Sequence, residues 1–310
     1  MIELKTTVEI QKFEKKISHA DKIMFIGSCF TENIGNKLLE SLFKVDVNPF
    51  GVLYNPTSIK KSLEILIEGK KFTGSDLKFY NNLWFSYFHH SKFSHKDKDI
   101  CLQNINNQLE ISSNFIREAK YLFITFGTAW VYKLATTQQT VSNCHKVPAP
   151  EFTRELLNIE NIVKKYNKII LLLKEINPDL QIIFTLSPVR HLKDGAVENQ
   201  RSKAILHLSI SQLVDSFENC YYFPSYEIMM DELRDYRFYK SDMTHINDIG
   251  IEYIWKKFEA TFFTQKTLQK IKEAQKLVRN LNHKPKDPDL EEYKNFKEQN
   301  LEKIKRFFIG

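Results

Sequence analysis

Two short segments, about 215 residues apart, hold the residue types of a nucleophile and its base. The first, Gly27-Ser28-Cys29-Phe30, follows an apolar run and opens a helical pattern. A sharp turn exposes such a thiol, and the first N–H groups of the helix favour an anion there. We therefore expect Cys29 to have a lowered pKa and to act as the nucleophile, with Ser28 as the alternative. Alone, the pattern also fits a buried packing thiol after a glycine that only ends a strand.

The second segment holds Asp242 and His245, three residues apart and ahead of a helical pattern. A carboxylate at this spacing can hold the imidazole in one tautomer and leave the other ring nitrogen to deprotonate a nucleophile. Alone, the pair is also typical of a surface loop or a helix cap. Taken with the first segment, it predicts a Cys29–His245–Asp242 triad that attacks an acyl carbonyl.

Five apolar runs separated by helical patterns predict how these segments are positioned. The expected strands are 22–26, 44–47, 121–126, 181–186 and 220–223, and the expected helices are 31–42, 56–68, 152–176, 199–217 and 246–263. This alternation indicates an α/β domain with a parallel sheet of about five strands, covered on both faces in three layers. Ligands of such sheets bind outside the carboxyl ends of the strands, where both segments fall.

Two parts of the chain depart from this rhythm. Residues 70–104 are rich in aromatic residues and predict an insertion within a main domain of residues 1–265. We expect His89 and His90 there to be packed or on the surface, with a place in the substrate site as the alternative. Residues 266–310 predict a basic, helical C-terminal extension that packs on the domain or on a second subunit, which suggests a homo-oligomer.

These motifs resemble those of a known superfamily. The string from Gly27 to Glu32 looks like the opening Gly-Asp-Ser-Leu-Thr-Glu block of the GDSL/SGNH hydrolases, and Asp242-x-x-His245 looks like their closing block. The Gly-Ser-Cys-Phe string is the signature of the GSCFA branch. Three further segments, Phe126–Trp130, Asn143–Lys146 and Ser187–His191, also look like that branch. The similarity spans residues 20 to 260 or so and implies a flavodoxin-like sandwich with acyl-ester chemistry.

The resemblance also implies an oxyanion site. Gly51 falls where the second block has its oxyanion glycine, so the N–H groups of Cys29 and Gly51 are the expected donors. The third block, normally Gly-x-Asn-Asp, begins at Gly127 and reads Gly-Thr-Ala-Trp, so its donor Asn is missing. Asn143 is the expected replacement, with a plain turn residue as the alternative. Ser28 stands where the hydrolases have Asp.

Two further residues are candidates for substrate binding. Arg190 follows the fourth expected strand and would bind an anionic group, or else form a structural ion pair. His145 is the other candidate. The neighbouring Cys144 raises the question of a metal, but zinc ligands usually come in close pairs, so we expect neither a metal nor a cofactor.

The charge of the chain argues against nucleic acid as a partner of the main domain. Residues 266–310 hold 12 Lys and Arg against 7 Asp and Glu, so they carry +5 of the net charge of +7. A scaffold or nucleic-acid role for this tail is an alternative. We expect no signal peptide, no membrane partner and a cytoplasmic location, since the four cysteines are scattered and no run approaches about 20 apolar residues.

The sequence thus predicts an acyl-ester hydrolase or an acyltransferase. An acylated carbohydrate is the suggested substrate, because the aromatic residues around 80–90 could stack on sugar rings. The alternative is a non-catalytic ligand-binding module on a degenerate hydrolase fold, and the reactivity of Cys29 discriminates between the two.

Overall fold

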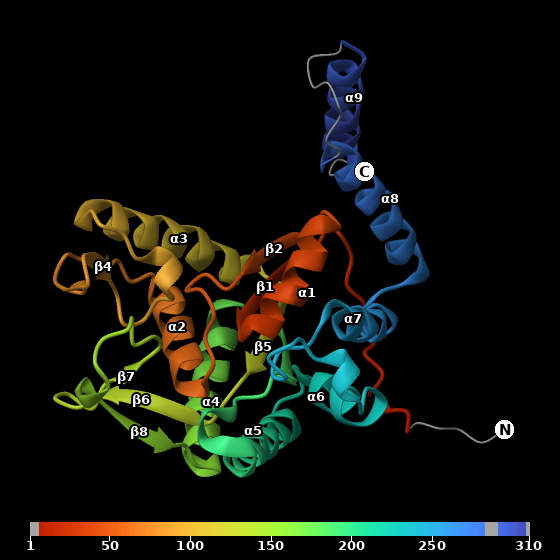
Figure 1. Cartoon of the computed structure of the whole chain (residues 1–310). Helices are drawn as coiled ribbons and strands as arrows, with labels where there is room; N and C mark the ends of the chain where they lie inside the picture. The colour runs from red at the N-terminus through yellow and green to blue at the C-terminus, as the bar shows by residue number, and fades with distance from the viewer. Residues whose placement is uncertain (1–5, 283–290, 308–310) are drawn as a thin grey trace.

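Five parallel strands form the central sheet, in the order β10-β9-β5-β1-β2 (Figure 1). A computed structural model of the chain describes residues 6–282 and 291–307. The strands are β1 (Lys22–Gly27), β2 (Lys44–Val47), β5 (Tyr121–Phe126), β9 (Gln181–Leu186) and β10 (Cys220–Phe223). The first strand lies next to the edge strand, which is the flavodoxin-like order. The predicted three-layer α/β fold is confirmed.

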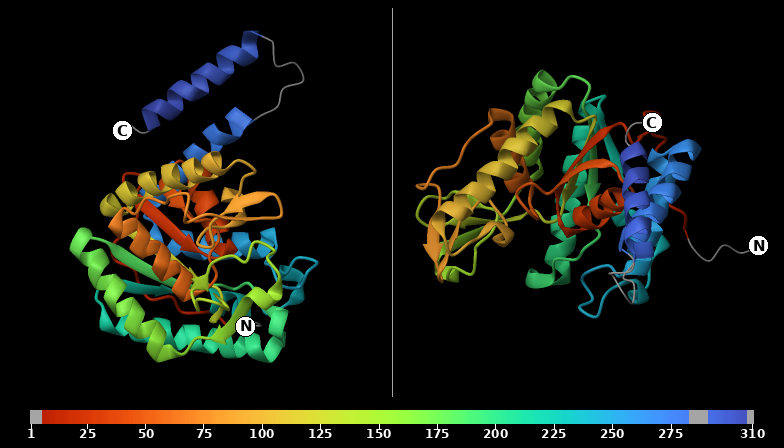
Figure 2. Two further views of the ribbon diagram at one scale, coloured as in Figure 1. Left: turned by 90° about the vertical axis from the view of Figure 1, so that its left-hand side faces the viewer. Right: turned by 90° about the horizontal axis from the view of Figure 1, so that it is seen from above.

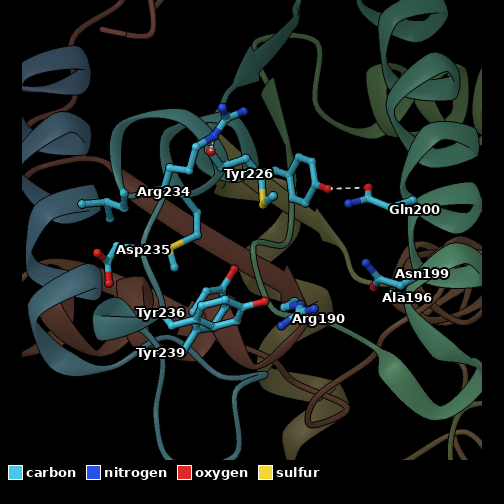
Figure 3. A pocket seen from close by; sticks show the side chains of 12 residues that line it. Arg190, Ala196, Asn199, Gln200, Tyr226, Arg234, Asp235, Tyr236 and Tyr239 are labelled. Atoms are coloured by element: carbon cyan, nitrogen blue, oxygen red, sulfur yellow. Dashed lines mark hydrogen bonds between the residues drawn. The ribbon is translucent and has the colours of Figure 1, made fainter. Parts of the chain in front are cut away.

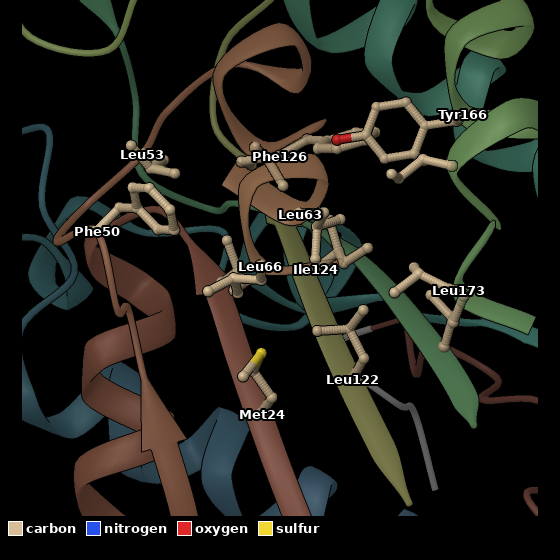
Figure 4. Packing of buried hydrophobic residues seen from close by; sticks show 14 of the residues in the cluster. Met24, Phe50, Leu53, Leu63, Leu66, Leu122, Ile124, Phe126, Tyr166 and Leu173 are labelled. Atoms are coloured by element: carbon tan, nitrogen blue, oxygen red, sulfur yellow. The ribbon is translucent and has the colours of Figure 1, made fainter. Parts of the chain in front are cut away.

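Helices cover both faces of this sheet (Figure 2). One face packs against α2 (Pro56–Glu68), α3 (Lys98–Glu118), α4 (Ile159–Ile176) and α5 (Gly195–Ser216), and the other against α1 (Cys29–Glu40) and α7 (Asp248–Phe262). The apolar side chains between the sheet and α2–α5 form the first core layer, and those between the sheet and α1 and α7 form the second. Successive residues of one strand alternate between them: Met24 lies in the first and Phe25 in the second. Figure 4 shows part of the first layer. Because both faces are buried, the strands are continuous apolar runs, which made them predictable from the sequence.

A second, antiparallel sheet was not predicted. It contains β6 (Trp130–Leu134), β7 (Thr140–Val141) and β8 (Phe152–Leu156), in the order β7-β6-β8. The expected helix over 152–176 is therefore wrong in its first part. The observed helix begins at Ile159, where the Asn158 side chain accepts the N–H of Asn161 as an N-cap. Helical spacing within a segment cannot reveal a partner strand elsewhere in the chain.

The expected insertion over 70–104 is a short hairpin followed by the start of a helix. The hairpin consists of β3 (Lys78–Tyr80) and β4 (Leu83–Phe85). The carboxylate of Asp97 caps α3 by accepting the N–H groups of Asp99 and Ile100. Residues 98–104 therefore belong to a helix that covers the sheet.

Two helices, α8 (Gln265–Asn282) and α9 (Glu291–Phe307), form the described part of the C-terminal region. Helix α8 leads away from the sheet, and α9 lies beside α8 (Figures 1 and 2). The side-chain amide of Asn280 in α8 donates to Oδ1 of Asn300 in α9 at 3.1 Å. Ile271 of α8 is buried in the second core layer. None of the helices within the described ranges combines the length and apolar character that crossing a bilayer requires.

Contacts of Gly27 fix the bend between β1 and α1. Its φ is +151°, and a Cβ there would lie 2.4 Å from the carbonyl oxygen of Thr125, so only glycine fits. Its N–H donates to Oδ1 of Asn48 at 2.8 Å, and the N–H of Asn48 donates to the Phe25 carbonyl at 2.8 Å. Asn48 has a φ of +49°, a conformation that asparagine adopts more readily than most residues. These bonds hold the turn that carries the thiol.

Replacing Asn48 by alanine is therefore expected to destabilise the domain. The Gly27 amide would be left buried without an acceptor, so the free energy of unfolding should fall by about 1–3 kcal/mol. Urea titration followed by circular dichroism measures this change. The exposed Asn36 of α1 provides the control, since Asn36→Ala should stay within about 0.5 kcal/mol of the parent. Equal stabilities of the two variants would contradict this role of Asn48.

Candidate active site

The predicted site residues lie in loops that leave the same edge of the sheet. Cys29 follows β1, Gly51 follows β2, Gly127 follows β5 and Arg190 follows β9. In a parallel sheet the carboxyl ends of all strands meet at one edge, which is where such folds bind ligands. Four segments that are distant in the sequence therefore contribute to one region.

Ser28 and Cys29 have different surroundings. Ser28 is 0% exposed, and its hydroxyl donates to Oγ of Ser187, just after β9, at 3.0 Å. Cys29 is the first residue of α1 and is only partly buried. The serine side chain therefore points into the protein, and the thiol is the more accessible of the two candidate nucleophiles.

The expected lowering of the Cys29 pKa is wrong. Burial of the thiol raises its pKa, and the nearby carboxylate of Glu32 in the first turn of α1 raises it further. The N–H groups of Cys29 and Phe30 and the cation of Lys203 act in the opposite direction but are weaker. The thiol is therefore protonated at neutral pH and needs a base before it can attack.

Lys203, on α5, is a charged residue that sequence analysis missed. It is 2% exposed, and its Nζ donates to the carbonyl oxygens of Gly127 at 2.7 Å and Ser187 at 2.6 Å. Burial lowers the pKa of Lys203 to about 7, and its interaction with Cys29 opposes that shift. A signal was present in the sequence, because Lys203 lies on the same buried helical stripe as Asn199 and Leu206.

The structure brings Asp242 and His245 together as a hydrogen-bonded pair. Oδ2 of Asp242 lies 2.7 Å from Nδ1 of His245, and Oδ1 accepts the N–H groups of Thr244 and His245, each at 2.9 Å. The pKa of Asp242 is held well below its usual range, mainly by these two backbone bonds and to a smaller extent by the bond to the imidazole. With Nδ1 engaged, Nε2 is the nitrogen left for a reacting group.

The pair does not touch the thiol. Among the described residues, no hydrogen bond joins the His245 ring to Cys29. His245 does interact electrostatically with His191, which follows β9 at the same edge. Both halves of the predicted triad are thus found at the carboxyl edge of the sheet, without a direct contact between them that would allow proton transfer.

Arg190 supports that loop. Its N–H donates to the carbonyl of Thr244 at 3.1 Å, and its guanidinium donates to that of Met243 at 3.0 Å. The guanidinium also lies 6.0 Å from the ring centre of Tyr236 and 5.7 Å from that of Tyr239. It borders a cavity of about 220 Å³, shown in Figure 3, so its side chain is available to a ligand as well. The alternative of a structural ion pair does not apply, since its described partners are carbonyls and aromatic rings.

The N–H groups of the two expected oxyanion glycines are already engaged. The N–H of Gly51 donates to the Asn48 carbonyl at 2.7 Å, and that of Gly127 donates to the Tyr54 carbonyl at 2.8 Å. Gly51 still requires glycine, because its φ is +76° and a Cβ there would lie 2.2 Å from that of His90. A Cβ on Gly127 would lie 3.0 Å from the carbonyl oxygen of Tyr54, so that position is tightly packed. Their role in this structure is close packing of the loops.

His145 is committed to structure. Its Nε2 lies 3.0 Å from the carbonyl oxygens of both Ser86 and His89, and its ring stacks on Phe85 at 4.1 Å. Burial lowers the pKa of His145 to about 4. Asn143, whose Oδ1 accepts the N–H of His145 at 2.8 Å, holds the same loop and also borders a cavity.

That cavity, of about 290 Å³, is called the tryptophan cavity here. Its lining includes Tyr54, Trp130, Tyr132, Asn143, Arg154 and His191. Three buried nitrogens in this lining have no hydrogen-bond partner among the described residues: Nε1 of Trp130, Nε of Arg154 and Nε2 of His191. Such orphaned donors indicate a ligand that supplies acceptors. His90 also borders the cavity, whereas His89 stacks on Phe50 in the core.

No group of three His, Cys, Asp or Glu side chains within the described ranges is placed to hold a metal ion. Cys144 borders the tryptophan cavity, whereas the ring of His145 is bound to backbone carbonyls. The two neighbours thus serve different parts of the structure.

Removing the Glu32 carboxylate should make Cys29 more reactive. In Glu32→Gln the nearby negative charge is lost, so the pKa of the thiol falls and more thiolate is present at pH 7. We expect alkylation of Cys29 by iodoacetamide to be roughly two- to tenfold faster at that pH. Peptide mass spectrometry gives the rate at Cys29 itself. Glu40→Gln, at the exposed end of the same helix, should leave the rate unchanged. A slower reaction in Glu32→Gln would contradict this account.

The fold of the chain is similar to that of several solved carbohydrate esterases. Among solved structures, it resembles a carbohydrate esterase family 3 protein from Talaromyces cellulolyticus, with 11% identity, a TM-score of 0.35, and coverage of 82% of this chain and 99% of that one. The Clostridium thermocellum family 3 carbohydrate esterase has 11% identity, a TM-score of 0.35, and coverage of 82% and 98%. The acetyl xylan esterase Est2A from Butyrivibrio proteoclasticus has 12% identity, a TM-score of 0.39, and coverage of 77% and 62%.

These structural likenesses are too distant to support an argument about function. No curated protein matches the sequence. The model of the GSCFA family, in contrast, matches residues 22–258, and that of the C-terminal domain of GSCFA domain proteins matches residues 274–308. The first match covers the whole central sheet and the candidate site, so the chain belongs to the GSCFA family.

Proposed function

We propose that this protein transfers or hydrolyses acyl esters, with Cys29 as the nucleophile. One observation carries the proposal. An accessible thiol at a helix N-terminus and the hydrogen-bonded Asp242–His245 pair lie at the same edge of the sheet. A nucleophile, a base and a carboxylate that orients the base are the parts that covalent acyl transfer needs.

In the proposed reaction, Nε2 of His245 takes the proton of the thiol as the sulfur attacks the acyl carbonyl carbon. The base is required because Cys29 is protonated at neutral pH. The alcohol then leaves with the proton from His245, and an acyl thioester remains on Cys29. Water, or a second hydroxyl group in a transferase, loses a proton to His245 and attacks the thioester, which regenerates the thiol. Asp242 keeps the imidazole in the required tautomer throughout.

The tryptophan cavity supports a polyhydroxylated alcohol, such as a carbohydrate, as the group that carries the acyl ester. Its three orphaned nitrogens suit a ligand with several oxygen acceptors. Trp130 and Tyr132 add apolar surface, although the Arg154 guanidinium already lies 4.8 Å and 5.0 Å from their ring centres. The aromatic residues behind this proposal therefore come from β6 and not, as the sequence suggested, from the segment around 80–90.

A non-catalytic binding module is the second candidate. The raised pKa of Cys29 and the missing contact between Cys29 and His245 favour it. The cavities would then serve binding alone. The cytoplasmic location, the boundary of the main domain at residue 265 and a homo-oligomer formed through α8 and α9 remain predictions.

Substitution of Cys29 tests the proposal directly. Cys29→Ala should abolish hydrolysis of p-nitrophenyl acetate, and His245→Ala should lower kcat by about 10²–10⁴ because the general base is lost. Release of p-nitrophenol gives the rates, and mass spectrometry of quenched enzyme should show the acyl group on Cys29. His207→Ala removes an exposed histidine of α5 that lies outside both cavities and should retain activity within about twofold.

Two outcomes of this experiment would contradict the assignment. Full turnover by Cys29→Ala would exclude the thiol as the nucleophile. Loss of activity in Ser28→Ala, together with an acyl group on Ser28 of the wild-type protein, would identify the serine instead. Folding of each variant is checked by its thermal melting temperature.

Trp130 tests the substrate class. In Trp130→Phe the orphaned indole N–H is removed while an aromatic ring stays, so KM for an acetylated sugar should rise by about two- to tenfold, the equivalent of one hydrogen bond. Hydrolysis of p-nitrophenyl acetate, which has no sugar hydroxyls, should change little. Trp84→Phe, in the β3–β4 hairpin, is the matched control. Equal KM values for the sugar ester in both variants would contradict a carbohydrate in this cavity.

A further inference from the structure

We propose that His191 supplies the oxyanion donor that the Gly127-Thr-Ala-Trp segment lacks, through an N–H at Nε2. This inference rests on the proposed acyl-transfer function and makes His191 a catalytic residue of that reaction. A tetrahedral intermediate needs side-chain or backbone donors for its negative oxygen. The position that would hold the donor Asn is Ala129, which is fully buried and whose N–H is bound to Ser202.

The geometry places the His191 ring beside the end of β5. A Cβ built on Gly127 would lie 3.1 Å from Nε2 of His191 and 3.0 Å from the carbonyl oxygen of Tyr54. The ring meets that of Tyr54 edge to face, with 5.4 Å between centres. The backbone N–H of His191 donates to Oδ1 of Asn199 at 2.9 Å, which fixes the start of this loop. The imidazole is therefore held between the loops that follow β2 and β5, where the family resemblance places the oxyanion.

Nε2 itself has no partner. It is buried and makes no hydrogen bond to any residue that the structure describes, although the ring borders the tryptophan cavity. A buried polar nitrogen without a partner is costly, so one is expected only where a ligand or a water completes it. An oxyanion formed during the reaction would be such a partner.

Two charged groups of the site interact with this ring. Lys203 interacts electrostatically with both His191 and Cys29, and its Nζ donates to the carbonyl of Gly127. His245, the proposed base, also interacts with His191. The imidazole thus interacts with the proposed base and with a cation that acts on the nucleophile.

The charge state of His191 suits a donor rather than a second base. Burial lowers the pKa of His191 to about 3, and the neighbouring Lys203 and His245 lower it in the same direction. The ring is therefore neutral at pH 7 and carries one N–H. A neutral imidazole N–H can stabilise a developing oxyanion without losing its proton.

Two other candidates are less suited to this role. Asn143 lies in the loop after β7 and not directly after a strand of the central sheet, and its Oδ1 accepts the N–H of His145. The N–H of Gly51 already donates to the Asn48 carbonyl. Nε2 of His191, in contrast, is buried beside Gly127 and makes no hydrogen bond to any described residue.

Three variants test the role of His191. His191→Leu removes the N–H and should lower kcat on p-nitrophenyl acetate by about 10²–10³, with KM changed less than about threefold. His191→Gln retains an amide N–H near the position of Nε2, so its kcat should be at least tenfold higher than that of His191→Leu. His207→Leu, at an exposed histidine of α5 that pairs with Glu227, is the matched control and should keep kcat within about threefold. The rate of Cys29 alkylation by iodoacetamide should be the same in all three, because alkylation forms no oxyanion.

The outcomes separate this inference from the proposed function. An unchanged kcat in His191→Leu, an equal loss in His207→Leu, or a parallel loss of alkylation would overturn the role of His191 while leaving the thiol chemistry intact. If the wild type neither turns over esters nor forms an acyl-Cys29, the proposed function fails. Long-range ¹H–¹⁵N spectra at pH 7, assigned with His191→Gln, give an independent result. They should show the proton of His191 on Nε2, and a proton on Nδ1 would overturn the inference even without turnover.

Discussion

The ammonium group of Lys203 ties together the ends of the two central strands at the candidate site. Its bonds to the carbonyls of Gly127 and Ser187 fix the loops after β5 and β9, and Ser187 in turn accepts the Ser28 hydroxyl. An ammonium group buried this deeply needs such oxygens in place of its hydration, and burial lowers the pKa of Lys203 to about 7. The same group of bonds holds Ser28 against the loop after β9, whereas Lys203 has only a weak effect on the pKa of Cys29.

The site differs from that of a cysteine enzyme with a preformed thiolate. Burial and Glu32 keep the thiol of Cys29 protonated, so its reactivity would depend on the base and not on a low pKa. In the proposed reaction the Asp242–His245 pair would supply that base, and it lies on an exposed loop held by Arg190. A protonated resting thiol would protect the protein from oxidation and alkylation until a substrate brings the base and the nucleophile together.

Much of the fold was predictable because the information was local. The central strands and α2 were predicted almost to the residue, since strands buried on both faces are continuous apolar runs and helices repeat their apolar residues at 3.6-residue intervals. The two candidate segments were also predictable, because a strand-turn-helix cysteine and an Asp-x-x-His pair are short patterns. The antiparallel sheet of β6, β7 and β8 was not, because its pairing joins segments whose individual patterns are ambiguous.

The sequence by itself therefore determined the order of the strands and helices, the loops that reach the carboxyl edge, and the Asp242–His245 pair. Only the tertiary structure decided which atoms are accessible and how each is charged. It buried Ser28, raised the pKa of Cys29, placed Lys203 under the site and left Nε2 of His191 without a hydrogen bond to any residue in the described part of the chain. The physical reason is that solvation and electrostatic energy depend on neighbours in space, and here those neighbours come from strands far apart in the chain.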